Sequence, residues 1–518
     1  MRRTLAVVLV PLLIALAPGL VLERPPAPGL AHAAGPGRTL VVAVPAEPPH
    51  IDPSEPVGPQ HDFNNHIYRK LYAFTPQMVP EPDLVAVETV SRDLKTWTLE
   101  LKRNVTFSDG TALNAAAVKY SIERMLEPAR RAPMAVLFRP IKEVRVKGEH
   151  VVEIETREPF ASLKHNLAHP NAGIISPKAD REMGPRFGRA PVSAGPYVVG
   201  EWVSGDRIVL TRFEAYQGPR PYYDRIVFRI VPTPETRLAM VERGEAQVAI
   251  RMPPTLTRVA AGNAELRLIR LDGTSLYYFW LNMNTPLMAD ARVRKALSLA
   301  VDRDAIMKRV ALGAASPARS VVEKTIRFSC PVGALTYDPE AARRLVQEAG
   351  VSGQRLKMLA SEGQWELDRQ VAEAVAGYMR QVGFEPDLRL IADAAAFREA
   401  SGKREVHMGL VAWPGATADP DHYLKRQLWG EIAGQPWNFA GYRNPAVDAL
   451  IARGARTFED AERAKIYCEA QRLIWDDRPW LVLYRLDGAA LARADITGIE
   501  VYVNSQSHLF TRARPSDR

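Results

Sequence analysis

Cysteine is nearly absent from this chain: its 518 residues include only two, Cys330 and Cys468. Two thiols are too few for a disulfide-built scaffold or for a zinc site with four cysteine ligands. The fold must therefore be stabilised mainly by apolar cores, and the length allows about three domains that each bury one. The sequence leaves open whether the two cysteines are bonded to each other.

Blocks of charge of one sign are also missing. The formal net charge is +9, from 68 Lys plus Arg and 59 Asp plus Glu. Basic residues are interleaved with acidic ones, as in residues 290–295 and 302–304, whereas proteins that bind nucleic acids gather their positive charge in patches or stripes. We therefore expect a hydrated surface of mixed sign and no nucleic-acid partner.

Common catalytic motifs are lacking as well. The chain has no Gly-x-Ser-x-Gly, no Ser-x-x-Lys, no His-Glu-x-x-His and no phosphate-binding glycine loop. We therefore expect that the protein is not an enzyme and holds no cofactor. One alternative is a secreted metal-dependent hydrolase, because His165 and His169 have the spacing of two ligands on one helix face. No third ligand lies near them in the sequence, so no metal site is predicted.

One long apolar run stands at the start of the chain. Arg2 and Arg3 precede an apolar stretch from Leu5 to Leu22, and the small-x-small sequence 31–33 follows. This pattern predicts a signal peptide over residues 1–33, cleaved before Ala34. The alternative is a membrane anchor, but Pro11 and Pro18 interrupt the run. No cysteine lies near Ala34, so we expect an exported, soluble, periplasmic protein without a lipid anchor.

In the rest of the chain, segments with strand periodicity alternate with helical ones. Strands are expected at 39–44, 97–101, 226–231 and 247–250, with hairpins at 144–155 and 197–210. Helices are expected at 115–126, 234–243, 293–310, 339–348, 367–382, 445–453 and 461–476. This alternation indicates an α/β fold.

Ten collinear segments, spread over nearly the whole chain after residue 33, share a resemblance to one known family. They are Ala46–Pro53, Trp97–Thr111, Gly195–Val199 with Gly205–Leu210, Asp224–Ile230, Thr236–Glu245, Val293–Ile306, Tyr337–Ala342, Tyr442–Leu450, Ala461–Arg463 and Pro479–Tyr484. The chain resembles the extracytoplasmic solute-binding proteins of ABC importers, in the family (family 5) that binds dipeptides, oligopeptides, nickel chelates, opines, glutathione or haem.

The resemblance implies the fold of type II periplasmic binding proteins, in which two lobes close about a hinge, plus an additional small domain. Carried onto this sequence, lobe I takes residues 34–66, 191–273 and 481–518, the additional domain 67–190, and lobe II 274–480. The ligand then lies between the lobes. The implied partners are a peptide-like or other polar small solute and an ABC permease of the inner membrane, and we expect a monomer.

The resemblance also suggests residues that contact the ligand. They are Glu47, in the loop after the first strand, Tyr278 and Trp280 on the strand 276–282, and Trp413, Gly415 and Asp419 in the segment 412–421. Because side chains alternate along a strand, Tyr278 and Trp280 share one face, and Tyr277 and Phe279 share the other, which is expected to face the core.

The ligand itself is left open. In peptide-binding relatives an aspartate three residues after the tryptophan pairs with the peptide's α-ammonium, and here that position is Ala416. A simple dipeptide is therefore disfavoured, and modified peptides, opine-like compounds, glutathione-like acids and other polar solutes remain. Another alternative is a nickel- or haem-chelate carrier, in which His422, His50, His61 or His66 completes the coordination of the ligand. The group formed by Asp419, Asp421 and His422 either binds a polar ligand or caps the following helix.

Overall fold

The computed structural model describes residues 38–54, 61–130, 132–413, 415, 417–430, 437–502 and 507–516. The predicted signal peptide and its cleavage site lie outside this part of the chain, and so does Ala416, the position at which peptide-binding relatives have an aspartate. Within it, every helix is too short or too polar to span a bilayer.

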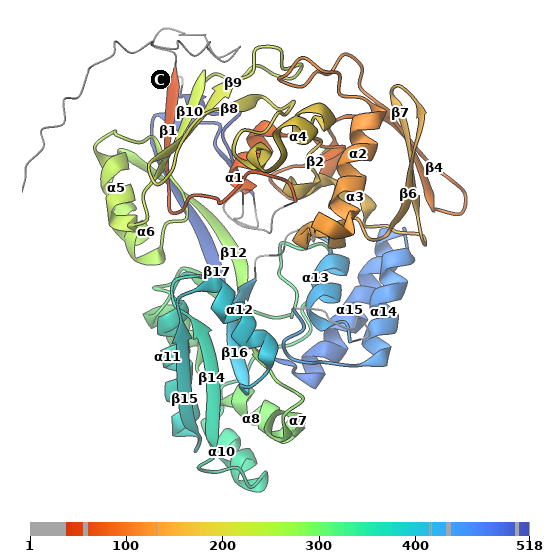
Figure 1. Ribbon diagram of the computed structural model, residues 1–518. Helices are drawn as coiled ribbons and strands as arrows, with labels where there is room; N and C mark the ends of the chain where they lie inside the picture. Colours follow the sequence, from red (N-terminus) through yellow and green to blue (C-terminus); the bar gives the residue numbers. More distant parts are fainter. Residues whose placement is uncertain are drawn as a thin grey trace, which may run out of the picture. The chain divides into compact units, whose positions relative to one another are not determined.

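A large mixed sheet runs through the protein (Figure 1). In spatial order its strands are β15 (Glu385–Ile391), β14 (Arg355–Ser361), β16 (Met408–Trp413), β12 (Leu266–Leu281), β17 (Trp480–Arg493), β11 (Val248–Ala249), β1 (Thr39–Val44), β10 (Arg225–Ile230), β9 (Arg207–Arg212) and β8 (Tyr197–Val203), and β13 (Ala315–Pro317) pairs with β17. The predicted strand 39–44 and the hairpin 197–210 are confirmed. β1 is rich in valine and pairs with two parallel neighbours, β10 and β11, as expected for a strand in the middle of a sheet.

The strands β12 and β17 are far longer than the others and lie antiparallel along most of their length (Figure 1). Their amino-acid sequences place apolar side chains on both faces, because both faces are covered. On one face, Tyr277 and Phe279 belong to a core shared with α8 (Ala291–Ala300) and α11 (Asp368–Gln381). On the other face, Tyr278 and Trp280 belong to a core shared with α13 (Pro420–Leu428) and α15 (Asp460–Asp477). These two strands therefore connect the two ends of the large sheet.

A second sheet of four antiparallel strands is built by residues 85–156. Its order is β4 (Val85–Val90), β5 (Thr96–Leu101), β7 (Val151–Thr156) and β6 (Ile141–Gly148). β5 confirms the strand predicted at 97–101 and alternates buried and half-buried residues, and the hairpin predicted at 144–155 is confirmed as β6 and β7. Short two-stranded ladders are formed by β2 (Tyr72–Phe74) with β3 (Pro80–Pro82), β18 (Ile496–Thr497) with β21 (Arg514–Pro515), and β19 (Glu500–Val501) with β20 (His508–Leu509).

The α-helices cover the sheets. They are α1 (His61–Ile67), α2 (Ala115–Leu126), α3 (Leu163–Ala168), α4 (Pro177–Met183), α5 (Pro234–Glu242), α6 (Pro254–Ala260), α7 (Pro286–Ala289), α8 (Ala291–Ala300), α9 (Arg303–Arg309), α10 (Pro339–Glu348), α11 (Asp368–Gln381), α12 (Ala394–Lys403), α13 (Pro420–Leu428), α14 (Pro445–Arg456) and α15 (Asp460–Asp477). Local chemistry sets several starts: Asn114, Asp338 and Asn444 each cap a helix through a side-chain oxygen that accepts a backbone N–H. The predicted α/β fold is confirmed.

The single helix predicted over 293–310 is wrong. The structure divides this segment into α8 and α9, because Val301 is extended and Asp302 begins a new helix by accepting a hydrogen bond from the backbone N of Ala305 at 2.9 Å. The apolar spacing continues across the break, so periodicity alone did not indicate it. A capping aspartate inside a helical pattern was the signal that distinguishes two helices from one.

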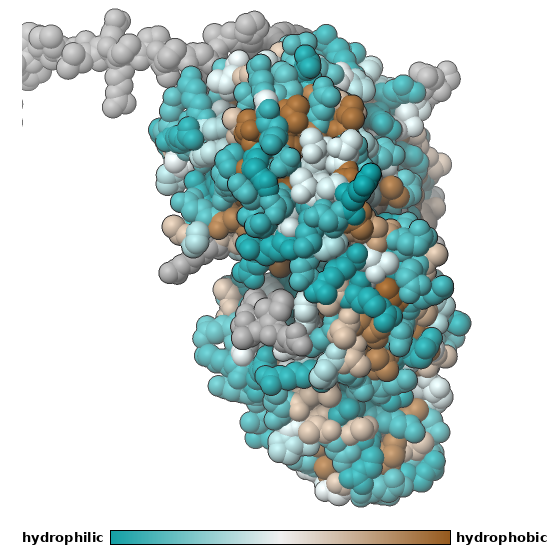
Figure 2. Space-filling model, turned by 90° about the vertical axis from the view of Figure 1, so that its right-hand side faces the viewer, coloured by the Kyte–Doolittle hydropathy of each residue, from teal (hydrophilic) through white to brown (hydrophobic). Residues whose placement is uncertain are grey.

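The surface is of mixed polarity. On the face shown in Figure 2, hydrophilic residues cover most of the surface, and hydrophobic ones form separate patches. Many surface charges are paired with the opposite sign, as in Arg207 with Glu201 and Lys403 with Glu399. The mixed-sign surface expected from the sequence is therefore present on the described residues.

Candidate functional site

A cavity of about 670 Å³ lies where the loop after β1, the segment after β11, the strands β12, β16 and β17, and the segment before α11 meet. Its polar and charged lining comprises Arg237, Arg251, Thr274, Ser275, Tyr277, Gln364, Trp365, Glu366, Asp487 and His508. Binding sites for small molecules in proteins generally have volumes of about 300 to 1,000 Å³. The cavity is large enough for a small peptide or a compound of similar size.

Two guanidinium groups lie at one wall of this cavity. Arg237 is 2% exposed, and its Nη atoms donate to the carbonyls of Val231 and Pro232 at 2.8 Å and of Arg251 at 3.0 Å. Desolvation lowers the pKa of Arg237 to about 10, so it still carries its positive charge at neutral pH. Arg251 donates from Nη2 to Asp62 at 2.7 Å.

Glu366 supplies an acidic group to the same cavity. Desolvation raises the pKa of its carboxyl to about 7, although Arg251 and Arg237 act in the opposite direction. The hydroxyl of Tyr277 donates to the backbone carbonyl of Glu366 at 2.6 Å and so fixes this segment against β12. Near neutral pH the cavity lining therefore carries the positive charges of Arg237 and Arg251, the partly ionised carboxyl group of Glu366, and the carboxylate of Asp487, which is paired with Arg270.

This arrangement suits recognition better than catalysis. Guanidinium groups bind carboxylates with charge-assisted hydrogen bonds, and a carboxyl group accepts bonds from ammonium or amide donors. A solute that carries carboxylates together with an amino or amide group matches the lining of the cavity. An aromatic wall from Trp365 and Tyr277 provides apolar contact.

The residues predicted from the sequence to contact the ligand lie outside the lining of this cavity. Glu47 is next to Ala46, which does line it, but its carboxylate accepts from Trp202 Nε1 at 2.6 Å and Gly205 N at 2.7 Å. Desolvation acts to raise the pKa of Glu47, but these bonds and those of Arg189 and Ser204 outweigh it and lower the pKa to about 2. In the structure Glu47 thus fastens the loop after β1 to the turn between β8 and β9.

Both faces of β12 are buried. Tyr277 and Phe279 lie in a core as expected, and Tyr277 also lines the cavity. Tyr278 is fully buried, donates to Gln427 Oε1 and stacks on Trp480 with ring centroids 4.0 Å apart. Trp280 is 1% exposed and packs on Phe439. Alternation correctly separated the two faces, but it could not tell which face meets a cavity when both are buried.

Trp413 is the last residue of β16, and Gly415 and Asp419 lie between it and α13. Gly415 has a φ of 63°, and a Cβ at this position would come within 2.6 Å of the side chain of Ile326, so glycine is required here. Asp419 caps α13 by accepting from Asp421 N at 3.0 Å. It also accepts from Ser162 Oγ at 2.9 Å and Arg463 Nη2 at 3.1 Å. Of the two roles left open by the sequence, capping is the one that the structure displays.

His165 and His169, the candidate ligands of the alternative hydrolase, contact different neighbours. α3 ends at Ala168, so His169 lies just beyond the helix, and its ring contacts that of His61 edge to face at 5.1 Å. His165 instead faces Asp419, with Nδ1 3.9 Å from Oδ2. In the described part of the chain, no three His, Cys, Asp or Glu residues are grouped as metal ligands would be.

The other histidines considered from the sequence are distributed over several segments. His61 and His66 are buried in α1, where they bond to Asn171 Oδ1 at 2.8 Å and to the carbonyl of Asp62. His422 is buried in α13, and His50 is half-buried beside Gly188. Desolvation lowers the pKa of His61 and of His66 to about 4, so both are neutral at physiological pH.

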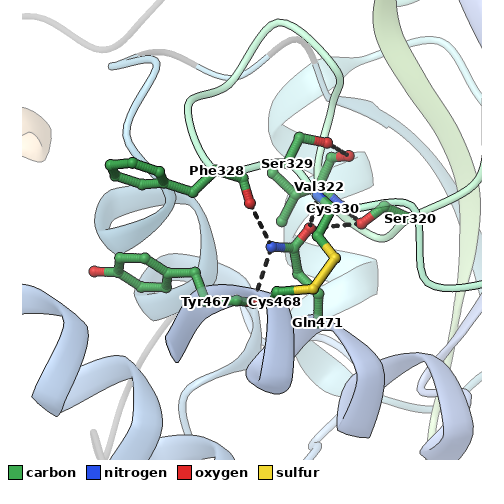
Figure 3. Close-up of a disulfide and its surroundings, with 8 residues drawn as sticks. All are labelled: Ser320, Val322, Phe328, Ser329, Cys330, Tyr467, Cys468 and Gln471. Atoms are coloured by element: carbon green, nitrogen blue, oxygen red, sulfur yellow. Dashed lines mark hydrogen bonds between the residues drawn. A yellow bond between two sulfur atoms is a disulfide. The ribbon is translucent and has the colours of Figure 1, made fainter. Parts of the chain in front are cut away.

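A disulfide between Cys330 and Cys468 answers the question that the sequence left open (Figure 3). Gln471 accepts from Cys330 N at 3.0 Å and Ser320 Oγ at 2.7 Å, and donates to the carbonyl of Phe328 at 2.8 Å. The bridge and this amide together hold the loop before α10 on α15. Residues of the same loop support the segment after β16, because Arg327 N donates to the carbonyl of Ala418 at 3.0 Å.

The sequence reasoning missed Arg237, Arg251 and Glu366 as cavity residues. Arg237 lies inside one of the segments that carry the family resemblance, but a lone arginine on a helix is ordinarily a surface residue. Arg237, Arg251 and Glu366 are too far apart in the sequence to form one local motif. Only the pairing of β1 with β10 and β11 and of β12 with β16 and β17 brings these segments together.

Comparison with known proteins identifies similar chains. The family model described as bacterial extracellular solute-binding proteins, family 5 Middle, matches residues 79–433. The glutathione-binding protein GsiB of Escherichia coli O1:K1 is 31% identical over 426 residues, which cover 80% of this chain and 82% of that protein.

Solved structures show the same fold. The dipeptide-binding protein of Pseudoalteromonas sp. SM9913, in complex with Met-Leu, superposes with a TM-score of 0.83 at 22% identity, covering 92% of this chain and 100% of that one. NikA of Brucella suis, in complex with Fe(III)-EDTA, also has a TM-score of 0.83 at 23% identity, with the same coverage. The predicted fold of type II periplasmic binding proteins is therefore confirmed.

Proposed function

Because this chain belongs to the bacterial extracellular solute-binding proteins of family 5, it is the solute-binding component of an ABC importer, and we propose that its solute is a small acidic peptide of the glutathione type. The observation that carries the proposal is the charge of the cavity, where Arg237 and Arg251 act on Glu366 and the carboxylate of Asp487 is already paired with Arg270. A solute with two carboxylates and one ammonium group complements these charges. The 31% identity to a glutathione-binding protein supports the same class of solute.

The domain boundaries expected from the sequence remain part of the proposal. We propose lobe I from residues 34–66, 191–273 and 481–518, lobe II from 274–480, and the additional domain from 67–190. β12 spans Leu266–Leu281 and β17 spans Trp480–Arg493, so both long strands cross a proposed boundary between the lobes. Strands that belong to both lobes are suited to act as a hinge.

The remaining expectations on cellular context are proposed in the same way. We propose that the protein is exported, soluble and periplasmic, is monomeric and carries no lipid anchor, and that it delivers its solute without chemical change. The similar proteins named above are solute-binding proteins rather than enzymes. Mass analysis of the exported form should find a start near Ala34.

The proposal is tested by the solute that the protein retains. Native mass spectrometry of protein purified from its own periplasm should show one bound acid of low mass. A thermal-shift panel should include glutathione, its diethyl ester, dipeptides, opines and nickel–histidine, because a 100-fold excess over Kd stabilises a protein by about 2.7 kcal/mol. We expect stabilisation by glutathione and not by its ester. Stabilisation by nickel–histidine alone, with matching absorbance bands, would instead establish the chelate carrier.

A further inference from the structure

A buried arginine lies on the opposite face of the sheet from the cavity. Arg426, in α13, is 8% exposed, and its Cζ atom lies 4.9 Å from the ring centroid of Trp413 and 4.4 Å from that of Trp437. Ala412 lines the cavity, and the next residue of β16, Trp413, projects to the other face, because side chains alternate along a strand. The arginine with its two indoles is thus separate from the cavity described above.

Two nitrogen atoms of this guanidinium have no hydrogen-bond partner in the part of the chain that the structure describes. These are the Nε and Nη1 atoms, and both are buried. Among the described residues, no carboxylate pairs with its charge. Stacking on indoles partly compensates a buried positive charge, but it does not satisfy N–H donors, and buried donors in proteins are nearly always bonded.

Further unpartnered groups surround it. His422 lies four residues before Arg426 and so on the same face of α13, and both of its ring nitrogens are buried without a partner among the described residues. The indole N–H of Trp413 and Nε2 of His169 are likewise buried without a hydrogen-bond partner among the described residues. His169 comes from the segment after α3, and it interacts electrostatically with His422 and Arg426. Two separate parts of the chain therefore present unused polar groups around one buried cation.

We propose that Arg426, with the indole N–H of Trp413 and the imidazole of His422, forms a second binding subsite that accepts a carboxylate. A carboxylate brings two acceptor oxygens and one negative charge, and these match a guanidinium edge and neighbouring N–H donors. The carboxylate comes either from the transported solute or from a free carboxylic acid. The first source rests on the proposed function, whereas the second does not.

Acetate is the probe that tests the subsite without reference to the solute. Tryptophan emission and thermal stability of the whole mature chain are followed as sodium acetate replaces sodium chloride at constant ionic strength. We expect a saturable response in the wild type and at least tenfold weaker acetate binding in Arg426→Gln, because a charge-assisted hydrogen bond changes affinity by roughly tenfold to a hundredfold. Arg426→Lys should retain a weaker response, since it keeps the charge but loses the fork of donors.

Arg453→Gln is the matched control, because Arg453 is an exposed arginine of the neighbouring helix α14, and it should respond to acetate like the wild type. Identical responses of the wild type and Arg426→Gln, or no saturable response in the wild type, would overturn the proposal. Should Arg426→Gln be unfolded by circular dichroism, Arg426→Lys and the wild type still decide the question.

Glutathione and its monoethyl ester distinguish the two sources. If the solute places a carboxylate on Arg426, Arg426→Gln should bind glutathione at least tenfold more weakly than the wild type does. If the wild type binds acetate through Arg426 but ignores glutathione, the subsite stands and the proposed solute fails. If glutathione binds equally to both proteins while acetate still requires Arg426, the subsite serves a free carboxylic acid.

Discussion

The guanidinium of Arg251 lies 2.7 Å from the carboxylate of Asp62, which is buried in α1. The same carboxylate accepts from His508 N at 2.9 Å and bonds to His508 Nδ1 at 2.8 Å. Arg251 and His508 both line the cavity, whereas Asp62 does not. One buried carboxylate thus positions two groups of the cavity wall from behind.

Asp62 should make the protein sensitive to acid. Desolvation alone would raise its pKa, but Arg251 and His508 outweigh this and lower the pKa from 3.8 to about 2. This contribution, about 2 kcal/mol, is present above pH 4 and is lost as the pH falls towards 2. When the free energy of unfolding is measured with urea at pH 6 and at pH 3, it should fall less between these pH values for Asp62→Asn than for the wild type. Equal losses in the two proteins would contradict this role.

Glu366, in contrast, should make the folded protein less stable as the pH rises. Its folded-state pKa is raised from 4.5 to about 7, so the folded protein retains a proton that the unfolded chain has released, and stability falls as the pH rises from about 4.5 to 7. Relative to the wild type, Glu366→Gln should gain about 2 kcal/mol between pH 5 and pH 8. Denaturant titrations at both pH values measure this gain. Glu362→Gln, at an exposed ion pair with Arg369, is the control and should show no such gain.

Asp419 should prove to be a structural residue. Its ion pair with Arg463 is buried, with side chains 0% and 2% exposed, and breaking such a pair costs about 3 to 5 kcal/mol. Asp419→Asn should therefore lower the free energy of unfolding strongly. Asp460→Asn breaks an exposed pair with Arg327 and should cost less than about 1 kcal/mol. If Asp419→Asn unfolds like the wild type but binds solute more weakly, Asp419 contacts the ligand, as the family resemblance suggested.

The disulfide should contribute to stability through the length of chain that it closes. Cys330 and Cys468 are 138 residues apart, and loop closure on this scale stabilises a protein by about 2 to 5 kcal/mol. The double variant Cys330→Ser, Cys468→Ser should melt at a lower temperature than the oxidised wild type and should no longer respond to a reductant. A wild type whose melting temperature is unchanged by dithiothreitol would count against this contribution.

The sequence predicted the elements well, because capping residues and apolar periodicity are local signals. Asn114 and Asp338 each stand directly before a helix that was predicted. The fold followed from ten collinear segments of family resemblance. The split between α8 and α9 was missed since the apolar spacing continues through Asp302.

The cavity could not be predicted from the sequence. Arg237, Arg251 and Glu366 come from three separate segments, and only the sheet brings these together. Tyr277 and Tyr278 illustrate the same limit, because alternation shows that they point to opposite faces but not which face borders a cavity. The charge of a site that is built from distant segments can be determined only after the fold is known.

Calorimetric titration of the mature chain with glutathione, beside an Ala46→Trp variant, tests the central claim most directly. Ala46 is exposed at the cavity wall, so an indole there should fill the cavity without disturbing the core. Ala116→Trp, at an exposed alanine of α2, is the matched control. The account predicts saturable binding at one site in the wild type and in Ala116→Trp, and none in Ala46→Trp. Equal binding by all three proteins would place the solute elsewhere, and no binding by the wild type would contradict the proposed solute.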